Sequence, residues 1–186
     1  AVMGSCYVNK VEGRRSPSVA LTNNGAEESK GTPMLKEAHQ LLKTTPGIRF
    51  VGNIEPRDVP NGEVDVVVCD GFTGNVLLKG IEGSIKYMTR QLKGIFMKNF
   101  KTKMAALAIK NEFKALKASL DPNEVGGTAM LGISKPVIKA HGSSDARAIY
   151  NAIRQAISFV DSGIIDDITA NISYMRVDKQ AEKELG

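Results

Sequence analysis

Apolar residues occur along the chain in short runs and in helix-spaced stripes, and the two patterns alternate. The run at residues 18–21 (SVAL) predicts a buried strand. Residues 31–43 carry apolar side chains at helical spacing and predict a helix with Thr32 as its N-cap. Residues 48–51 and 64–69 (VDVVVC) predict two more strands. The near-continuous apolar character of the second is typical of a parallel sheet buried on both faces.

The rest of the chain continues with helices and short strands. The turn at residues 70–75 (DGFTGN) predicts a helix that starts at about Val76. The remaining predictions are two basic helices within residues 83–121, strands at 128–133 and 136–140, and helices at 144–160 and 164–184. Because strands and helices alternate from residue 18 to residue 95, we predict an α/β fold. The pattern predicts α/β layers with a mostly parallel sheet and a protruding helical pair.

Composition places the chain among ordinary globular proteins. It has 186 residues, of which 42% are hydrophobic and 24% charged, which fits one domain with a core of good size. The longest stretch without a charged side chain is 11 residues, and a membrane-spanning helix needs roughly 20. Cys6 and Cys69 cannot form a disulfide framework and lack metal-ligand spacing, so we expect no metal site and a reducing cytoplasm. We also expect further protein upstream of Ala1, and no signal peptide is visible.

Basic residues are concentrated in one region. Between Lys86 and Lys117 there are nine Lys or Arg residues and one acid, Glu112, whereas the rest of the chain is close to neutral. This region is interpreted as a helix pair packed in the core or in a dimer, as a contact with an anionic membrane or an acidic partner, or as a nucleic-acid groove. Nucleic acid is the weakest of the three, because few aromatic residues are present for base stacking.

Two loops that follow predicted strands carry candidate chemistry, since ligands of open α/β sheets bind at the carboxyl ends of strands. Residues 24–33 lead into a helix N-terminus, where free N–H groups suit an anion and Lys30 could add a point charge for phosphate. In residues 70–75, two glycines would let the backbone approach a ligand, and Asn75 supplies an amide. The alternatives are a solvated loop with an ordinary cap in the first case and a tight glycine turn in the second.

A third loop, residues 140–145 (AHGSSD), contains His141, which could bind an anion or transfer a proton. The alternative is a hydrogen-bonded structural histidine followed by a serine that caps the next helix. We expect His39, within the first predicted helix, to lie on the surface. Cys69 is expected to be a buried strand residue.

These loops belong to a set of motifs that together resemble the carboxyl-terminal half of PlsX, the bacterial acyl-ACP:phosphate acyltransferase family. The combination of DGFTGN with AHGSSDARA is highly specific, and the resemblance covers nearly the whole chain. The matching segments are residues 25–31 (GAEESKG), 50–58 (FVGNIEPRD), 64–79 (VDVVVCDGFTGNVLLK), 126–127 (GG), 136–148 (PVIKAHGSSDARA) and 151–155 (NAIRQ).

The resemblance implies an enzyme that makes acyl-phosphate and free acyl carrier protein (ACP) from acyl-ACP and inorganic phosphate, without a cofactor. It also implies α/β/α layers in a fold like that of isocitrate and isopropylmalate dehydrogenases, a homodimer, and peripheral attachment to the inner face of the cell membrane. A glycerol-3-phosphate acyltransferase would act downstream in phospholipid synthesis. On this basis Lys30 and Asn75 are the catalytic candidates. The other candidates are Gly31, Asp70, Gly71, Gly74, His141 and Ser143 for substrate and phosphate binding, and Met104, Leu107 and Ile109 for membrane contact.

The resemblance also implies that residues 1–186 are the carboxyl-terminal half of such an enzyme, with the amino-terminal half absent. Three other functions stay open. A phosphotransacetylase-like enzyme would use acyl-CoA in place of acyl-ACP. A non-catalytic module would bind ACP or anionic lipid through the lysine-rich helices, and a dimerisation domain would bind neither.

Overall fold

The computed structural model describes residues 1–121, 124, 126–142 and 144–171, and they form two compact units. The first unit comprises Ala1–Val68, Thr128–Lys139 and the described residues from Ile153 onward; the second comprises Cys69–Gly127 and Ala140–Ala152. The elements are α1 (Val2–Lys10), β1 (Ser18–Thr22), α2 (Pro33–Thr44), β2 (Arg49–Ile54), the 3₁₀ helix η1 (Val59–Asn61), β3 (Val66–Val68), α3 (Gly71–Phe96), α4 (Phe100–Ala108), α5 (Lys110–Ser119), β4 (Gly127–Ala129), β5 (Ile138–Ala140), α6 (Ala146–Asp161) and α7 (Ile164–Ala170).

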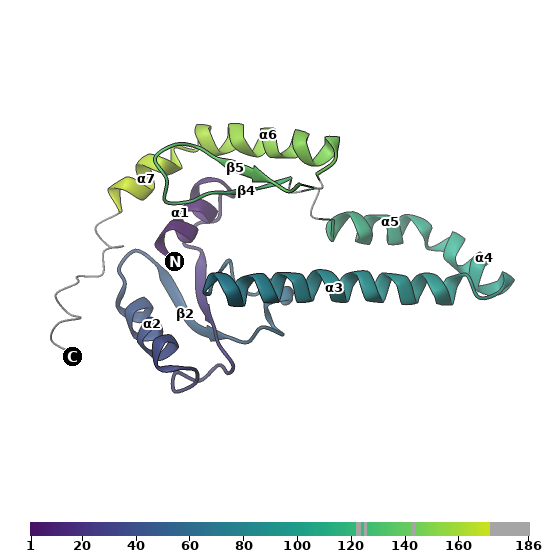
Figure 1. Ribbon diagram of the computed structural model, residues 1–186, viewed down its shortest axis with the longest axis horizontal. Helices are drawn as coiled ribbons and strands as arrows, with labels where there is room; N and C mark the ends of the chain where they lie inside the picture. Colours follow the sequence, from purple (N-terminus) through teal and green to yellow (C-terminus); the bar gives the residue numbers. More distant parts are fainter. Residues whose placement is uncertain (122–123, 125, 143, 172–186) are drawn as a thin grey trace. The chain divides into compact units, whose positions relative to one another are not determined.

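A three-stranded parallel sheet with the strand order β2-β1-β3 organises the first unit (Figure 1), so the predicted α/β class is confirmed. The central strand β1 is buried at every position, as its apolar run predicts. Thr32 caps α2 by accepting the Leu35 N–H, as its side-chain type predicts. The strand predicted at residues 64–69 is confirmed as the shorter β3. The prediction that both its faces are buried is wrong for the described residues, because all three residues of β3 are only half-buried.

A second group of buried residues lies in the first unit where α1 packs against α7. Cys6 of α1 is buried there with Phe159, Ile164 and Ile168. Gln155 also donates a hydrogen bond to the Tyr7 hydroxyl at 3.0 Å. The sequence pattern does not predict α1, because its apolar residues have little helical periodicity. Packing against distant residues therefore stabilises this helix more than its own pattern does.

Asp65 holds the start of β1. Its carboxylate accepts hydrogen bonds from the Ser18 N–H, from the Ser18 hydroxyl and from Arg14 Nη1, each at 2.7 Å. The bond from the Ser18 N–H is the largest of the effects that lower the pKa of Asp65 from 3.8 to about 2. Because the fold favours the ionised carboxylate, its contribution to stability is complete above pH 4 and is lost as the pH falls through 2.

The Asp65→Asn variant is therefore expected to melt at a lower temperature than the wild type at pH 5. This difference should shrink between pH 4 and pH 2, where the wild-type carboxylate becomes protonated as well. Melting temperatures measured from pH 2 to pH 6 check the expectation, with Asp161→Asn at an exposed position as the control. A difference that stays constant over this pH range would contradict the role given to Asp65.

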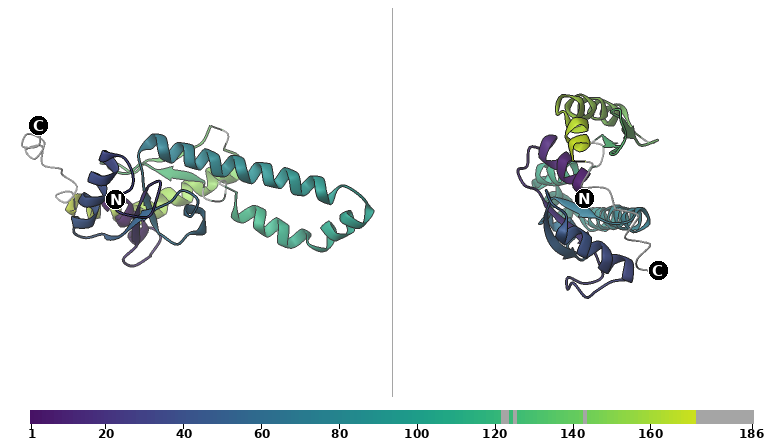
Figure 2. Two further views of the ribbon diagram at one scale, coloured as in Figure 1. Left: turned by 90° about the horizontal axis from the view of Figure 1, so that it is seen from below. Right: turned by 90° about the vertical axis from the view of Figure 1, so that its left-hand side faces the viewer.

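In the second unit, α4 and α5 run back along the long helix α3 (Figures 1 and 2). Phe96 of α3 and Phe113 of α5 make an edge-to-face contact with their ring centroids 6.0 Å apart. The prediction of two basic helices is wrong, because the region forms α3, α4 and α5. Asn99 starts α4 with a capping box, in which its side chain accepts the Thr102 N–H and the Thr102 hydroxyl accepts the Asn99 N–H.

Several predicted boundaries change in the remaining elements. The two strands predicted at 128–133 and 136–140 are confirmed as a two-stranded sheet, but β4 and β5 are shorter. The helix predicted at 144–160 is confirmed as α6. The one predicted at 164–184 is confirmed as α7 up to Ala170, and its part beyond 171 lies outside the described residues. Cys69 is exposed just after β3, so the prediction of a buried strand residue is wrong.

Candidate functional site

The loop between β1 and α2 presents Lys30 to solvent while its backbone is held. The Lys30 N–H donates to the Glu27 carbonyl at 3.1 Å, and the Lys30 carbonyl accepts a hydrogen bond from Asn23 Nδ2 at 3.1 Å. Asn23 is only 3% exposed, and its Oδ1 accepts the Asn24 N–H at 2.8 Å. Over the described ranges, no carboxylate forms an ion pair with Lys30. Its ammonium group is therefore available to an anionic ligand.

Two glycines let this loop fold closely around Lys30. Gly31 has a φ of +92°, and a Cβ at this position would lie 2.6 Å from Asn23 Oδ1. A Cβ on Gly25 would lie 2.8 Å from the Cγ of Lys30. Glycine at both positions thus allows the approach of Asn23 and of the Lys30 side-chain stem. The binding role predicted for Gly31 stays a prediction.

His39 is buried, so the prediction that it lies on the surface is wrong. The residue is only 2% exposed, and its ring meets Phe50 edge-to-face with the centroids 5.0 Å apart. His39 Nδ1 lies 2.9 Å from Asn53 Oδ1, and Asn53 Nδ2 donates to the Glu27 carbonyl at 2.9 Å. The sequence pattern of the helix cannot find this arrangement, because Phe50 and Asn53 come from the neighbouring strand β2.

An ion pair neutralises one carboxylate of the same loop. Glu28 Oε1 lies 2.8 Å from Lys43 Nζ and 3.7 Å from His39 Nε2. The hydrogen bond from Lys43 is the main cause that lowers the pKa of Glu28. The loop therefore pairs this acid with a lysine of α2, while Lys30 stays outside the pair.

The second predicted loop is the N-terminus of α3. The helix begins at Gly71, so the prediction of a start near Val76 is wrong. Asp70 is the reason: its Oδ1 accepts the N–H groups of Phe72 and Thr73, each at 2.9 Å. Hydrogen bonds from Thr73 are the main cause that lowers the pKa of the Asp70 carboxyl.

The other candidates of this segment differ in what surrounds them. A Cβ on Gly74 would lie 2.8 Å from Cys69 Sγ, which gives this glycine a packing reason. A Cβ on Gly71 would meet no described atom within 4 Å, so the space beside it is open to a ligand. Asn75 is exposed and lies close to the start of α3. The chemical roles predicted for these residues stay predictions.

The third predicted loop leads into α6. His141 is exposed, and its carbonyl accepts the Ser144 N–H at 3.0 Å. Asp145 Oδ1 accepts the Ala148 N–H at 2.8 Å, which is the bond that a capping side chain makes. Ser143, predicted to bind substrate or phosphate, lies outside the described residues. Lys30 and Gly31 belong to the first unit, whereas Asp70, Gly71, Gly74, Asn75 and His141 belong to the second.

The predicted membrane contacts are exposed. The exposed fractions are 50% for Met104, 62% for Leu107 and 42% for Ile109, all on α4 or directly after it. Basic residues such as Lys103 and Lys110 flank them. Among the helices that the structure describes, none is long and apolar enough to span a bilayer.

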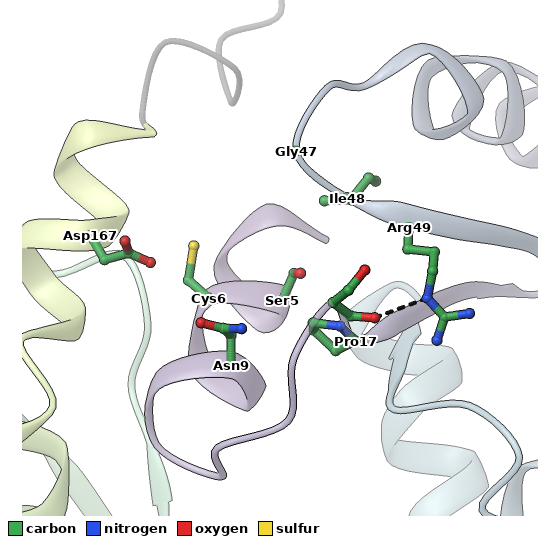
Figure 3. A pocket seen from close by; sticks show the side chains of 9 residues that line it. Ser5, Cys6, Asn9, Pro17, Gly47, Ile48, Arg49 and Asp167 are labelled. Atoms are coloured by element: carbon green, nitrogen blue, oxygen red, sulfur yellow. Dashed lines mark hydrogen bonds between the residues drawn. The ribbon is translucent and has the colours of Figure 1, made fainter.

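The first unit also contains an open cavity of about 490 Å³, which Figure 3 shows from close by. Cys6 and Asp167 lie next to each other on one side of it, and on the other side Arg49 Nε donates to the Ser16 carbonyl at 2.9 Å. Burial, and next the hydrogen bond with Asp167, raise the pKa of Cys6 to about 11. The thiol is protonated at neutral pH and is a poor nucleophile. The residues that line the cavity include none of the predicted site residues.

Comparisons with known proteins find close relatives. A family model described as "Fatty acid synthesis protein" matches residues 1–167. The chain is 50% identical over 172 residues to the phosphate acyltransferase of Oceanobacillus iheyensis. The matched residues make up 92% of this chain and 52% of that protein. It is 47% identical over 178 residues to the phosphate acyltransferase of Alkaliphilus oremlandii, and these residues make up 96% of this chain and 53% of that protein. For the phosphate acyltransferase of Acetivibrio thermocellus the identity is 48% over 177 residues, with coverages of 95% and 52%.

The chain spans about half the length of the curated relatives it matches. Their names agree with the family whose motifs the loops resemble, so the recognition of that family is confirmed. The match over residues 1–167 and the identity to these relatives show that the chain belongs to the fatty acid synthesis protein family.

Proposed function

We propose that the protein carrying this chain is an acyltransferase that converts acyl-ACP and inorganic phosphate into acyl-phosphate and ACP. The observation that carries the proposal is the identity of 47–50% to phosphate acyltransferases over more than nine-tenths of the chain. The ammonium of Lys30 is exposed, forms no ion pair with a carboxylate of the described residues and stands on a tightly held loop. These features support the proposal, because a lysine point charge suits a phosphate dianion.

In this reaction each candidate residue has a proposed role. An oxygen of HPO₄²⁻ attacks the thioester carbonyl, the carbon–sulfur bond breaks, and the phosphate proton ends on the ACP thiol. Lys30 binds and orients the phosphate, while Asn75 donates to the thioester carbonyl or to the phosphate. Gly31, Gly71 and Gly74 let backbone N–H groups approach, and His141 and Ser143 are further contacts of the phosphate. Asp70 contributes by capping α3 and so fixing the start of the helix that carries Asn75.

Family membership and the exposed apolar residues of α4 support a proposal for the wider setting of this reaction. The chain supplies the carboxyl-terminal half of an enzyme with a fold like that of isocitrate and isopropylmalate dehydrogenases, acting as a homodimer in the cytoplasm. Met104, Leu107 and Ile109 touch the inner face of the cell membrane, and the surrounding lysines attract its anionic lipids. The acyl-phosphate then serves a glycerol-3-phosphate acyltransferase in phospholipid synthesis.

Lys30→Ala and Asn75→Ala are expected to lower turnover by about 100-fold or more, because each removes a group that stabilises charge in the transition state. The measurement is phosphate-dependent thiol release from palmitoyl-ACP by the complete natural protein, with Lys36→Ala as the control on the exposed face of α2. Near-normal turnover in folded Lys30→Ala and Asn75→Ala variants would contradict these roles.

The same assay, together with measurements of binding and of dimer formation, separates the other functions. Equal or better turnover with palmitoyl-CoA would favour a phosphotransacetylase-like enzyme. Binding to anionic vesicles or to ACP without thiol release would favour a non-catalytic module. Dimers that bind neither would favour a structural dimerisation domain.

A further inference from the structure

Strand β2 contains an irregularity close to the Lys30 loop. Val19 of β1 is opposite Phe50, but Leu21, two residues later, is opposite Asn53, so β2 has one extra residue at this point. Gly52 lies in this interval with a φ of +101°, a conformation that favours glycine. The pairing and the φ value together define a β-bulge at Gly52, and a bulge changes the direction of the side chains that follow it.

The bulge decides what Asn53 contacts. In a regular strand, Phe50 and Asn53 are three residues apart and would point to opposite faces of the sheet. Here the buried His39 touches both: its ring lies against Phe50, and its Nδ1 is 2.9 Å from Asn53 Oδ1. The oxygen can only accept, so His39 Nδ1 carries the proton in this bond. One end of the Asn53 amide is thereby fixed by a residue that is 2% exposed.

The other end of the Asn53 amide reaches the Lys30 loop. Asn53 Nδ2 donates to the Glu27 carbonyl at 2.9 Å, and the Lys30 N–H donates to the same carbonyl oxygen at 3.1 Å. A carbonyl oxygen has two lone pairs, so it can accept both bonds. A single oxygen therefore joins the β2 side chain to the backbone of Lys30. On its other side, the Lys30 carbonyl is held by Asn23.

Satisfying the Glu27 carbonyl does not by itself explain this arrangement. Glu27 is exposed, and water could accept and donate the same hydrogen bonds there. Asn53 adds a fixed position for the Glu27 carbonyl. The bulge in β2 and the buried His39 hold the Asn53 side chain, and this side chain holds the carbonyl. Asn53 acts on the Lys30 N–H through the Glu27 carbonyl, and Asn23 holds the Lys30 carbonyl, while the Lys30 side chain stays exposed.

We propose that Asn53, aimed by the Gly52 bulge and held by His39, is the positioning residue that sets where Lys30 meets phosphate. The inference rests on the proposed function, since it gives Lys30 an anchor for that function. It makes Asn53 act through Lys30 and not on the substrate itself.

The first experiment is the kinetics of Asn53→Asp in the complete natural protein. This substitution keeps the size of the side chain and an acceptor for His39 but removes the N–H donor to Glu27. We expect kcat/KM for phosphate to fall by about 10- to 100-fold, because small displacements of a positioned group have effects of this order. The KM for palmitoyl-ACP should stay within about twofold of the wild type. A rise in this KM as well would indicate general damage to the enzyme and not a specific effect on phosphate.

Two further variants test the steps of the chain of contacts. Gly52→Ala meets no described atom within 4 Å and changes only the backbone conformation, so it should reproduce the phosphate effect of Asn53→Asp. Asn61→Ala, the removal of an exposed amide in η1, is the matched control and should leave the kinetics unchanged. Hydrogen exchange of residues 25–31 should become faster in the first two variants and not in the control.

The Lys30→Ala background separates this inference from the proposed function. If Asn53 acts through Lys30, adding Asn53→Asp to Lys30→Ala should cause no further loss of kcat/KM for phosphate. An impaired Lys30→Ala variant combined with a wild-type phosphate kcat/KM in Asn53→Asp would overturn this inference alone. A fully additive loss in the double variant would do the same. Near-normal turnover of Lys30→Ala would overturn the role of Lys30 and this inference with it, even if hydrogen exchange confirmed the anchor.

Discussion

The Gly126→Ala variant is expected to lose about 2–5 kcal/mol of unfolding free energy, the sum of left-handed backbone strain and overpacking. Gly126 has a φ of +93°, and a Cβ there would lie 2.5 Å from Ala152 N and 2.7 Å from Ala148 O. Both atoms belong to the backbone of α6, which cannot rotate aside as a flexible side chain can. The new Cβ would also lie 2.6 Å from the Cβ of Asn151, so it would clash with three atoms of α6.

Urea unfolding followed by circular dichroism checks this expectation, with Gly163→Ala as the control. Gly163 also has a positive φ, +65°, but a Cβ there would meet no described atom within 4 Å. The control should lose only the backbone contribution, about 1–2 kcal/mol. Equal losses in both variants would show that the close approach of Gly126 to α6 does not matter for stability.

The Gly31→Ala variant is expected to lose about 2–4 kcal/mol of unfolding free energy and most of its phosphate-dependent turnover. The new Cβ would lie 2.6 Å from Asn23 Oδ1, 2.9 Å from Asn23 Nδ2 and 3.0 Å from the Cβ of Leu35. Asn23 is buried, and its amide is already bonded to Asn24 and to the Lys30 carbonyl. It can move only by giving up the bond that holds Lys30, so stability and activity should fall together.

Gly62→Ala is the matched control for this substitution. Gly62 has a φ of +70°, and a Cβ there would meet no described atom within 4 Å. Thermal melts and palmitoyl-ACP turnover should show a small stability loss and normal kinetics in the control. A Gly31→Ala protein with wild-type turnover would contradict the link between Asn23 and the position of Lys30.

Local signals in the sequence were sufficient where neighbouring residues alone decide the structure. The apolar run of β1 and the Thr32 cap of α2 act within a few residues, and both are found as predicted. The same kind of signal is present at Asp70 and at Asn99, since both residue types favour helix N-caps. At Asp70 the glycines of DGFTGN favour a turn, which shifts the predicted helix start. The prediction for the long basic region includes no cap at Asn99.

In the candidate site, too, local sequence signals predict some features, and contacts between distant residues decide others. A lysine beside glycines at the end of a buried strand predicts the Lys30 loop as a candidate site, because this pattern suits an anion at a helix N-terminus. Local patterns do not identify Asn53 and His39 as its supports, although Asn53 lies in the motif FVGNIEPRD. A positive φ at Gly52 cannot be read from sequence, and without the bulge Asn53 and Phe50 would be placed on opposite faces.

The sequence by itself determined the α/β class, the family and the main strands and helices, and it predicted which residues carry chemistry. Each of these depends on side-chain type, on short-range periodicity or on motifs of consecutive residues. Only the tertiary structure decided that His39 is buried, that α1 is a helix packed through Cys6, and that Asn53 and Asn23 hold the backbone of Lys30. These features depend on strand register and on contacts between residues far apart in the chain, and a single residue's type or spacing does not encode them.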